Sequence, residues 1–292
     1  MLGRRAWAAI GGLSLVGVAG WLATSRQSSE GALARIRREG LIRIGYAIEA
    51  PYVFLDSKGQ LTGEEAEVAR KVVAGLEIPR IEWVQADFGS LLDQLEEGRF
   101  DVIVAGMFIT PARAQRASFS EPTFRVRQGL LVQKGNPHGL SAYEDFVRMP
   151  RLKIATLRGS IEESMIRGLG VSDAQIVVVP DALTGRVAIE SGLAAGLALS
   201  SPAIRHMGQR QQLGLTEAAL PFTPPTSDEY RHTGLGAAAF RRSDEDLRDA
   251  WNRQLKRIVG TSAHRLLMEE FGMGPDELPS GATSAEIPLQ GR

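Results

Sequence analysis

The sequence predicts a two-lobed α/β protein, and three observations lead to this fold class. Short apolar runs alternate with amphipathic segments of helix length, which is the pattern of parallel α/β units. A Gly-Asn-Pro break at 135–137 is followed by a restart of the same alternation. A second break, with three prolines within 221–227, precedes a strand-like segment at 234–241 that mirrors the one at 129–134.

Hydrophobic spacing predicts the individual elements. In 64–76 the residues Ala66, Ala69, Val72 and Val73 recur at intervals that place them on one face of a helix. Further helices are predicted at 89–97, 159–169 and 181–191, with two more after residue 241. Continuous apolar runs predict strands at 42–47, 81–84, 102–106, 129–135, 152–157, 176–179 and 197–200.

The two breaks divide the chain into lobes joined by two crossing segments, near 130–136 and 228–240. The predicted boundaries are 36–133 with 236–279 for the first lobe, 136–230 for the inserted second lobe, and 280–292 for a flexible tail. Two lobes joined by two crossing segments have the connectivity of a hinge.

Composition excludes several classes of function. The chain has 292 residues and equal numbers, 34 each, of basic and acidic side chains, so it has no basic surplus for nucleic acid. It has no cysteine, which excludes disulfides, thiol catalysis and a lipobox cysteine. The four histidines, His138, His206, His232 and His264, are scattered without metal-ligand spacing, and we expect neither a metal nor a cofactor.

The N-terminus predicts export. A basic start with Arg4 and Arg5 precedes an uncharged apolar run at 7–23, which is typical of a signal peptide or an uncleaved signal-anchor over 1–29. The run is slightly short for a membrane span, and both alternatives stay open. We expect a periplasmic or extracytoplasmic protein; without residues 1–29 it loses three arginines and no acid, so the net charge of zero becomes −3.

One turn offers the groups of a carboxylate receptor. After the apolar run at 102–105 come Phe108, Thr110, Pro111 and Arg113. Proline is well tolerated at the start of a helix, so Pro111 predicts a helix with Arg113 in its first turn. An anion there is attracted by backbone N–H groups and by a guanidinium fork that matches a carboxylate.

The second lobe offers a partner site. In Arg158-Gly-Ser-Ile-Glu-Glu163, Ser160 and Glu163 have the spacing of a capping box at a helix start. The backbone N–H groups near Ser160 and Ile161 are therefore predicted to face an anion opposite Arg113.

Several segments together resemble the solute-binding proteins of polar amino-acid ABC importers, family 3. They are Leu41-Ile-Arg-Ile-Gly-Tyr46, Thr62-Gly-Glu-Glu-Ala-Glu-Val-Ala69, Leu95-Glu-Glu-Gly-Arg-Phe-Asp-Val102, Gly106-Met-Phe-Ile-Thr-Pro111 and Gly159-Ser160. The resemblance covers about 41–278 and implies a periplasmic-binding-protein-like fold of type II, a small ligand in the cleft and an ABC permease as partner. We expect a monomer.

The resemblance also implies that the loop after the first strand contacts the ligand. This loop holds Glu49, a partner for a cationic group, and Tyr52. Phe88 and Phe108 follow the exits of other strands of the same lobe, so with Tyr52 they predict an aromatic cage, each ring contributing about 0.5–2 kcal/mol to holding a cation.

One departure from the family pattern concerns the second lobe. The resemblance implies an aspartate at the matching strand end in amino-acid binders of this family, whereas this chain has Ser200 and Ser201 there, and we expect Ser200 to contact the ligand. A primary ammonium is thus less well served than a delocalised cation, and the site segments most resemble the ectoine/hydroxyectoine-binding component. We predict a zwitterionic ligand, with ectoine or hydroxyectoine favoured.

Two alternatives stay open beside this reading. One is a polar amino-acid-binding protein of the same family; the other is a cyclohexadienyl dehydratase-like enzyme on the same scaffold, which needs a placed acid or base. No GxSxG, P-loop or HExxH motif occurs, and Glu49 is the one acid-base candidate, so we expect no catalytic residue.

Overall fold

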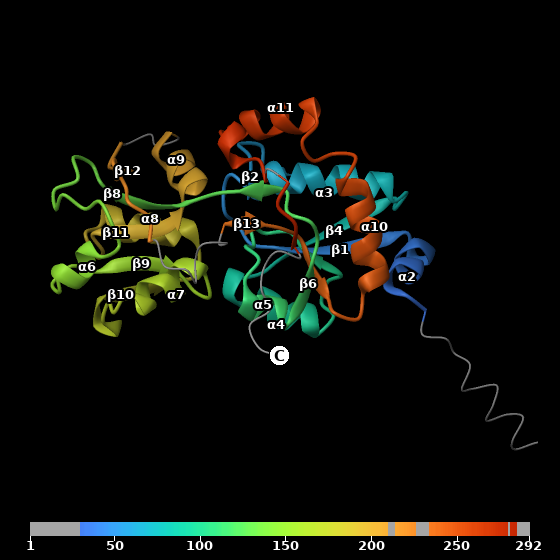
Figure 1. Ribbon diagram of the computed structural model, residues 1–292, viewed down its shortest axis with the longest axis horizontal. Coiled ribbons are helices and arrows are strands. Elements are labelled where there is room, and N and C mark those ends of the chain that lie inside the picture. Colours follow the sequence, from blue (N-terminus) through green and yellow to red (C-terminus); the bar gives the residue numbers. More distant parts are fainter. Residues whose placement is uncertain (1–29, 210–213, 226–233, 280, 285–292) are drawn as a thin grey trace, which may run out of the picture.

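The computed structural model describes residues 30–209, 214–225, 234–279 and 281–284, and shows two α/β lobes side by side (Figure 1). Each lobe is built on a five-stranded sheet, with the strand orders β4-β1-β5-β14-β6 and β10-β9-β11-β8-β12. The predicted fold class is confirmed. The predicted signal segment, 1–29, and most of the predicted tail lie outside the described residues.

The first lobe contains both ends of the described chain. Its main sheet consists of β1 (Leu41–Tyr46), β4 (Arg80–Gln85), β5 (Val102–Ile103), β6 (Ala117–Phe119) and β14 (Ala239–Arg241). Two small sheets pair β2 (Phe54–Leu55) with β3 (Leu61–Thr62), and β7 (Phe124–Arg125) with β13 (Leu235–Gly236). The helices are α2 (Ala32–Glu39), α3 (Glu64–Gly75), α4 (Leu91–Glu96), α5 (Pro111–Ala114), α10 (Glu245–Leu255) and α11 (Ser262–Glu270), with 3₁₀ turns η1 (Phe88–Ser90) and η4 (Pro275–Glu277).

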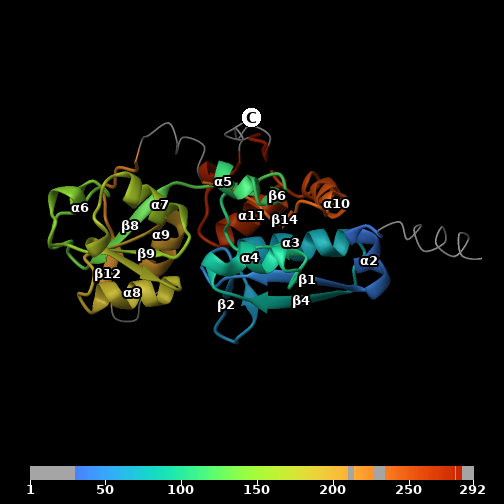
Figure 2. The same cartoon turned by 90° about the horizontal axis from the view of Figure 1, so that it is seen from below.

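The second lobe is continuous in sequence. Its strands are β8 (Gln128–Gln133), β9 (Ile154–Leu157), β10 (Ile176–Val179), β11 (Gly196–Ser200) and β12 (Thr216–Ala218). Its helices are α6 (Asp145–Arg148), α7 (Ile161–Gly168), α8 (Ala182–Glu190) and α9 (Ser201–Gln209), with the 3₁₀ turn η2 (Asp173–Gln175). Figure 2 shows the strands between α7 on one side and α8 on the other, so both faces of the sheet are covered.

Each sheet combines parallel pairs with antiparallel strands that complete it. β1 pairs in parallel with β4 and β5, and β9 pairs in parallel with β10 and β11. β14 lies between β5 and β6 and runs antiparallel to both, although its residues come more than 110 positions after them. The first sheet therefore combines strands from both sides of the inserted lobe.

The predicted crossing at 130–136 is wrong. Those residues belong to β8, which pairs with β11 and β12 inside the second sheet. The chain leaves the first lobe between Arg125 and Gln128, and the Gly-Asn-Pro break is a turn after β8 rather than the crossing. The first lobe thus ends before 133, because β8 finds its hydrogen-bond partners across the second sheet.

The returning segment enters the first lobe at β13, beside the outgoing one. Leu235 pairs with Arg125, and the Val126 N–H donates to the Gly234 carbonyl at 2.8 Å. Gly234 has φ +100°, and a Cβ there would lie 2.0 Å from the Val126 carbonyl oxygen, so this approach requires glycine. Of the predicted crossing at 228–240, residues 228–233 lie outside the described part.

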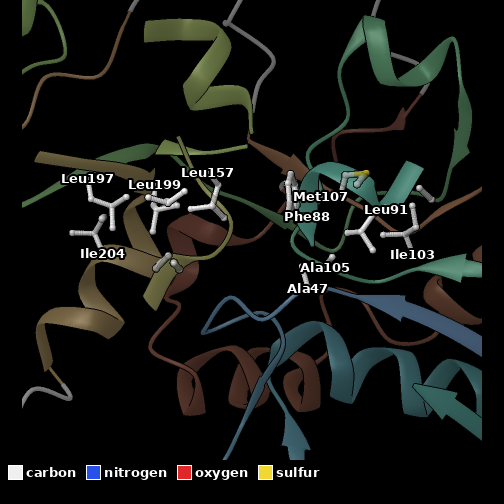
Figure 3. Close-up of a cluster of buried hydrophobic side chains, with 14 of the residues drawn as sticks. Ala47, Phe88, Leu91, Ile103, Ala105, Met107, Leu157, Leu197, Leu199 and Ile204 are labelled. Atoms are coloured by element: carbon white, nitrogen blue, oxygen red, sulfur yellow. The ribbon is translucent and has the colours of Figure 1, made fainter. Parts of the chain in front are cut away.

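Buried hydrophobic side chains fill each lobe and also reach the boundary between them. In Figure 3, Leu157 and Leu199 of the second lobe lie on one side of the boundary, and Phe88 and Met107 of the first lobe on the other. These residues belong to one buried cluster, so the two lobes are packed together at this point rather than held apart by solvent.

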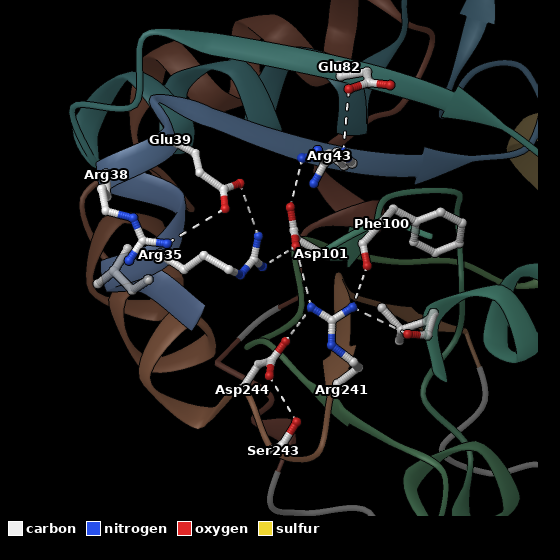
Figure 4. A network of polar contacts seen from close by, with 12 residues as sticks. Arg35, Arg38, Glu39, Arg43, Glu82, Phe100, Asp101, Arg241, Ser243 and Asp244 are labelled. Carbon is white, nitrogen blue, oxygen red and sulfur yellow. Dashed lines mark hydrogen bonds and ion pairs between the residues drawn. The ribbon is translucent and has the colours of Figure 1, made fainter. Parts of the chain in front are cut away.

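A charged network ties α2 to the sheet of the first lobe (Figure 4). Asp101, whose side chain is 4% exposed, accepts from Arg35 at 2.5 Å and pairs with Arg241 at 3.3 Å. Its second oxygen accepts the Arg43 N–H of β1 at 2.9 Å. One buried carboxylate thus joins α2, β1 and β14, and it fixes the start of β1 relative to the N-terminal helix and the C-terminal strand of the lobe.

Candidate ligand-binding site

A small pocket lies between the two lobes. It is lined by Glu49, Phe88, Gly106, Phe108, Arg113, Ser160, Ile161, Glu162, Leu199 and Ser200. Its cavity volume is about 20 Å³, which is room for about one water molecule. It continues into a groove of about 370 Å³ that shares Phe88, Arg113, Ser160 and Ile161 and adds Thr110. Seven of the nine predicted site residues line the central pocket, one more lines the groove, and Tyr52 lines neither.

The predicted Arg113 turn is present. Thr110 is the N-cap of α5 and its hydroxyl accepts the Arg113 N–H at 3.2 Å, with Pro111 at the first helical position. α5 has four residues, so the expected attraction of an anion to a helix N-terminus is small. What reaches the pocket is the guanidinium.

That guanidinium connects the lobes. Its Nη1 donates to the Phe108 carbonyl at 2.8 Å, and its Nη2 donates across the boundary to the Gly159 carbonyl at 3.0 Å. It lies 5.4 Å from the ring centroid of Phe88. Burial lowers the pKa of Arg113 to about 10, so it remains charged at neutral pH. A guanidinium has five N–H donors and can bind a further acceptor.

The second-lobe helix start differs in one respect from the prediction. Ser160 caps α7 and accepts the Glu163 N–H at 3.1 Å, while the Glu163 carboxylate accepts the Gly159 N–H at 2.7 Å. The Ser160 N–H, predicted to face an anion, donates instead to the Leu157 carbonyl at 3.1 Å because the chain makes a tight turn there. Ser160 and Ile161 nonetheless line the pocket.

Two of the three predicted aromatic walls are present. Phe88 and Phe108 line the pocket, whereas Tyr52 is 1% exposed and lies behind it, stacked on Phe124 with ring centroids 4.8 Å apart. This packing requires glycine at position 106 for two reasons. Gly106 has φ +65°, a conformation that other residues rarely adopt, and a Cβ there would lie 2.7 Å from the Tyr52 ring. The Tyr52 hydroxyl donates to Ser200 Oγ at 2.8 Å across the boundary.

Glu49 occupies the predicted position at the exit of β1. It lines the pocket and is 9% exposed. Burial, and then the nearby carboxylates of Glu162 and Glu65, raise the pKa of Glu49 to about 8.

Glu162 is the site residue that sequence reasoning missed. It is 4% exposed, lines the pocket from the first turn of α7, and its Oε1 is buried without a hydrogen-bond partner among the described residues. Burial raises its pKa to about 7, although its own backbone N–H, Arg113 and Ser160 act in the opposite direction. Ser200 stands at the strand end where the family's aspartate was expected to be missing, but the second lobe supplies an acid to the pocket from another element, α7. The available signal was two adjacent glutamates after Ser160, of which the cap uses Glu163.

Glu65 supports the pocket from behind. Its carboxylate accepts the Gly106 N–H at 2.6 Å and is also hydrogen-bonded by the Ala105 N–H. Burial, and then the charge of Glu64, raise the pKa of Glu65 to about 8. These bonds hold the loop that carries Gly106 and Phe108, which explains why the predicted strand at 102–106 is paired as a strand only at Val102–Ile103.

Within the described residues no group of three or more His, Cys, Asp or Glu side chains could hold a metal ion. His264 is buried on α11 and faces Glu64 of α3 at 3.3 Å. Its Nδ1 accepts the Gly260 N–H, which places the ring proton on Nε2, toward the carboxylate. This pair joins two helices and lies outside the pocket.

Comparison with known proteins gives a family match over most of the chain. The family model described as bacterial extracellular solute-binding proteins, family 3, matches residues 42–273. A probable amino-acid ABC transporter periplasmic-binding protein of Sinorhizobium fredii, y4tE, is 32% identical over 248 residues, covering 84% of this chain and 81% of that protein.

Solved structures agree on the fold. The crystal structure of EhuB in complex with hydroxyectoine superposes with a TM-score of 0.80 at 26% identity, covering 89% of this chain and 98% of that one. An ancestral amino acid-binding protein, AncCDT-1, described as a precursor of cyclohexadienyl dehydratase, gives 0.71 at 24% identity over 82% of this chain and 99% of its own. At that identity the second likeness concerns the fold alone.

Proposed function

Because the chain belongs to the bacterial extracellular solute-binding proteins, family 3, we propose that its interlobe pocket binds a small zwitterion for delivery to a membrane permease. The chain is a solute-binding receptor of an amino-acid-type ABC importer, and its family acts outside the cytoplasm. Among the described residues no helix combines the length and apolar character needed to cross a bilayer.

The observation that carries the ligand proposal is the placement of opposite charges in one buried pocket. Arg113 lies on one side with donors to offer a carboxylate, and Glu49 lines the same pocket. A ligand carboxylate would bind the guanidinium, and a ligand cation would lie near Glu49 with Phe88 and Phe108 against its faces. A neutral zwitterion carries both groups on one small molecule.

Ectoine and hydroxyectoine are the first ligands to test. Both carry a carboxylate and a flat cyclic amidinium, and the structural likeness to a hydroxyectoine complex supports this choice. A primary ammonium was disfavoured because serine replaces the aspartate at the strand end of the second lobe, and Glu162 offers an acid in the same pocket from another element. A polar amino acid is therefore the alternative ligand, supported by the amino-acid transporter relative.

The contacts across the boundary support binding by lobe closure. Tyr52 donates to Ser200 and Arg113 donates to Gly159, so the two sides of the pocket touch directly. The central cavity of about 20 Å³ is too small for any zwitterion of this class. We propose that the lobes open about the segments beside Arg125 and Leu235 and close on the ligand, with the protein acting as a monomer.

A ligand screen by thermal shift tests this function. A ligand that binds only the folded protein raises its stability by RT ln(1 + [L]/Kd), about 2.7 kcal/mol at a hundredfold excess over Kd. We expect ectoine or hydroxyectoine, or else one polar amino acid, to raise the melting temperature, and calorimetry then gives the affinity. Failure of every zwitterion in both assays would overturn the proposal.

The enzyme alternative has one specific observation behind it. Glu49 and Glu162 are two buried acids in one pocket with raised pKa values, a feature that catalytic sites share with binding sites. Incubation with prephenate and arogenate followed by product analysis separates the two functions. We propose a receptor and expect no turnover.

A further inference from the structure

Glu162 has the geometry of a ligand contact rather than of a structural residue. It lies in the first turn of α7, opposite the side of the pocket that Glu49 occupies. One carboxylate oxygen is buried without a hydrogen-bond partner in the described structure, which is unfavourable for folding. Glu163, the next residue, makes the capping contact, so the helix start does not need Glu162 for that purpose.

The charges in the pocket do not balance when both acids are ionised. Arg113 supplies one positive charge, while Glu49 and Glu162 supply two negative ones. A neutral zwitterion adds no net charge, but its cationic end gives both carboxylates a partner at short range. Without such a partner, the two acids favour their protonated forms, because burial raises both pKa values and the charge of Glu162 raises that of Glu49 further.

Resting on the proposed function, we propose that Glu162 is the acid that the second lobe contributes to the ligand. It accepts an N–H from the ligand's cationic group on the side opposite Glu49, and binding releases a proton from this pair to the solvent. The selected ligand class is a carboxylate joined to a cation with at least two N–H groups, such as an amidinium or a primary ammonium.

Other titratable groups near the pair do not replace it in this role. Glu65 lies behind Glu49 and already accepts two backbone N–H groups. Burial raises the pKa of Tyr52 and of Tyr143 well above 10, so both stay neutral. Arg113 stays positively charged throughout the range in question and lowers the pKa of Glu162.

The direction of the pH effect follows from these shifts. The pKa of Glu162 is raised to about 7 and that of Glu49 to about 8. A cation that binds beside them lowers both pKa values. Binding therefore releases protons between about pH 6 and pH 8. By linkage the affinity rises with pH across this window, by up to about tenfold per pH unit for each proton released, and levels off above it.

Calorimetry in two buffers of different ionisation enthalpy tests the proposal, with ectoine and L-glutamine as probes. For the probe that the wild type binds, we expect a buffer-dependent enthalpy at pH 7. The isosteric variant Glu162→Gln should bind roughly ten- to a hundredfold more weakly at pH 8, through loss of one charge-assisted hydrogen bond, and should depend less on pH. Glu162→Asp should retain the pH dependence.

Two controls make the result specific. Glu190→Gln neutralises a glutamate of α8 that pairs with Arg186 outside the pocket, and should bind as the wild type does. Glycine betaine has no N–H on its cation, so Glu162→Gln should weaken any binding of it less than it weakens binding of the N–H-bearing probe, because only the attraction between charges is lost. Thermal unfolding checks that each variant is folded, and Glu162→Gln should be at least as stable as the wild type at pH 8.

The outcomes separate the two proposals. A folded Glu162→Gln variant with unchanged affinity and unchanged buffer dependence overturns the role of Glu162 while the receptor function stands. Tight wild-type binding that is independent of buffer and of pH from 6 to 9 also overturns it. Failure of the wild type to bind any zwitterion overturns the proposed function, and the role of Glu162 with it.

Discussion

Arg113→Ala tests the centre of the binding proposal. The substitution removes the guanidinium that donates to the Phe108 carbonyl at 2.8 Å and to the Gly159 carbonyl at 3.0 Å, and with it the proposed partner of the ligand carboxylate. In a closed pocket that carboxylate would then be buried without a counter-charge. Removal of one partner of a buried pair costs about 3–5 kcal/mol.

This free energy sets the expected loss of affinity. At about 1.4 kcal/mol per factor of ten, the dissociation constant should rise between roughly one hundredfold and several thousandfold. Arg113→Lys keeps the charge but loses the planar fork that reaches two carbonyls and the ligand together, so we expect an intermediate loss of roughly tenfold.

Arg116→Ala is the matched control. Arg116 lines the same groove, but its guanidinium is bound by Asp93 at 2.6 Å and by Glu96 at 2.7 Å. Its removal should change the affinity by less than about threefold. Calorimetry at pH 8 measures all three variants after thermal unfolding shows that they are folded. A folded Arg113→Ala variant within threefold of the wild type would refute the assignment of the carboxylate subsite.

Three further predictions concern stability and closure. Asp101→Asn should lower the free energy of unfolding by about 3 kcal/mol, and the melting temperature by roughly 6–12 °C, with ligand affinity unchanged, because the buried network loses its charge. Burial raises the pKa of Glu65 to about 8, so its contribution to stability is full below pH 4.5 and is lost as pH rises through 8. The free energy of unfolding measured with denaturant should therefore fall over this pH range, and Glu65→Gln should reduce that fall by about 1–3 kcal/mol. Arg205 of α9 binds Glu277 at 2.7 Å between the lobes, so Arg205→Ala should destabilise the closed form by about 0.2–1 kcal/mol and give a larger radius of gyration in solution scattering; an unchanged affinity and radius would contradict this.

Local patterns predicted the elements well because their causes are local. The apolar spacing of α3 and the proline and threonine of α5 fix helices through residues three or four positions apart. The lobe crossing was not predictable in this way. β8 is placed by pairing with β11, about 68 positions later, and its own residues show only that it is a buried strand.

Site residues that directly follow a strand were predictable from the sequence. Residues whose side-chain orientation depends on packing against distant residues were less predictable. Glu49 and Arg113 follow strands, and the structure brings both to one pocket. Tyr52 turns away because Phe124, 72 positions later, offers its ring a stacking partner. Glu162 was missed because the orientation of a residue in the first turn of α7 matters only once the other lobe is in place.

The position of β14 determines the order in which the two sheets can be completed during synthesis. Every strand of the second sheet lies between residues 128 and 218, so the ribosome has supplied that whole sheet before the first one can be finished. β5 and β6 must wait for residues 239–241 to arrive between them, more than 110 peptide bonds after β6 was made. A nascent chain halted near residue 230 would hold a complete second sheet and an incomplete first one, in which β5 pairs only with β1 and β6 has no neighbour until β14 arrives. Truncation before β14 should therefore damage the half that was synthesised first.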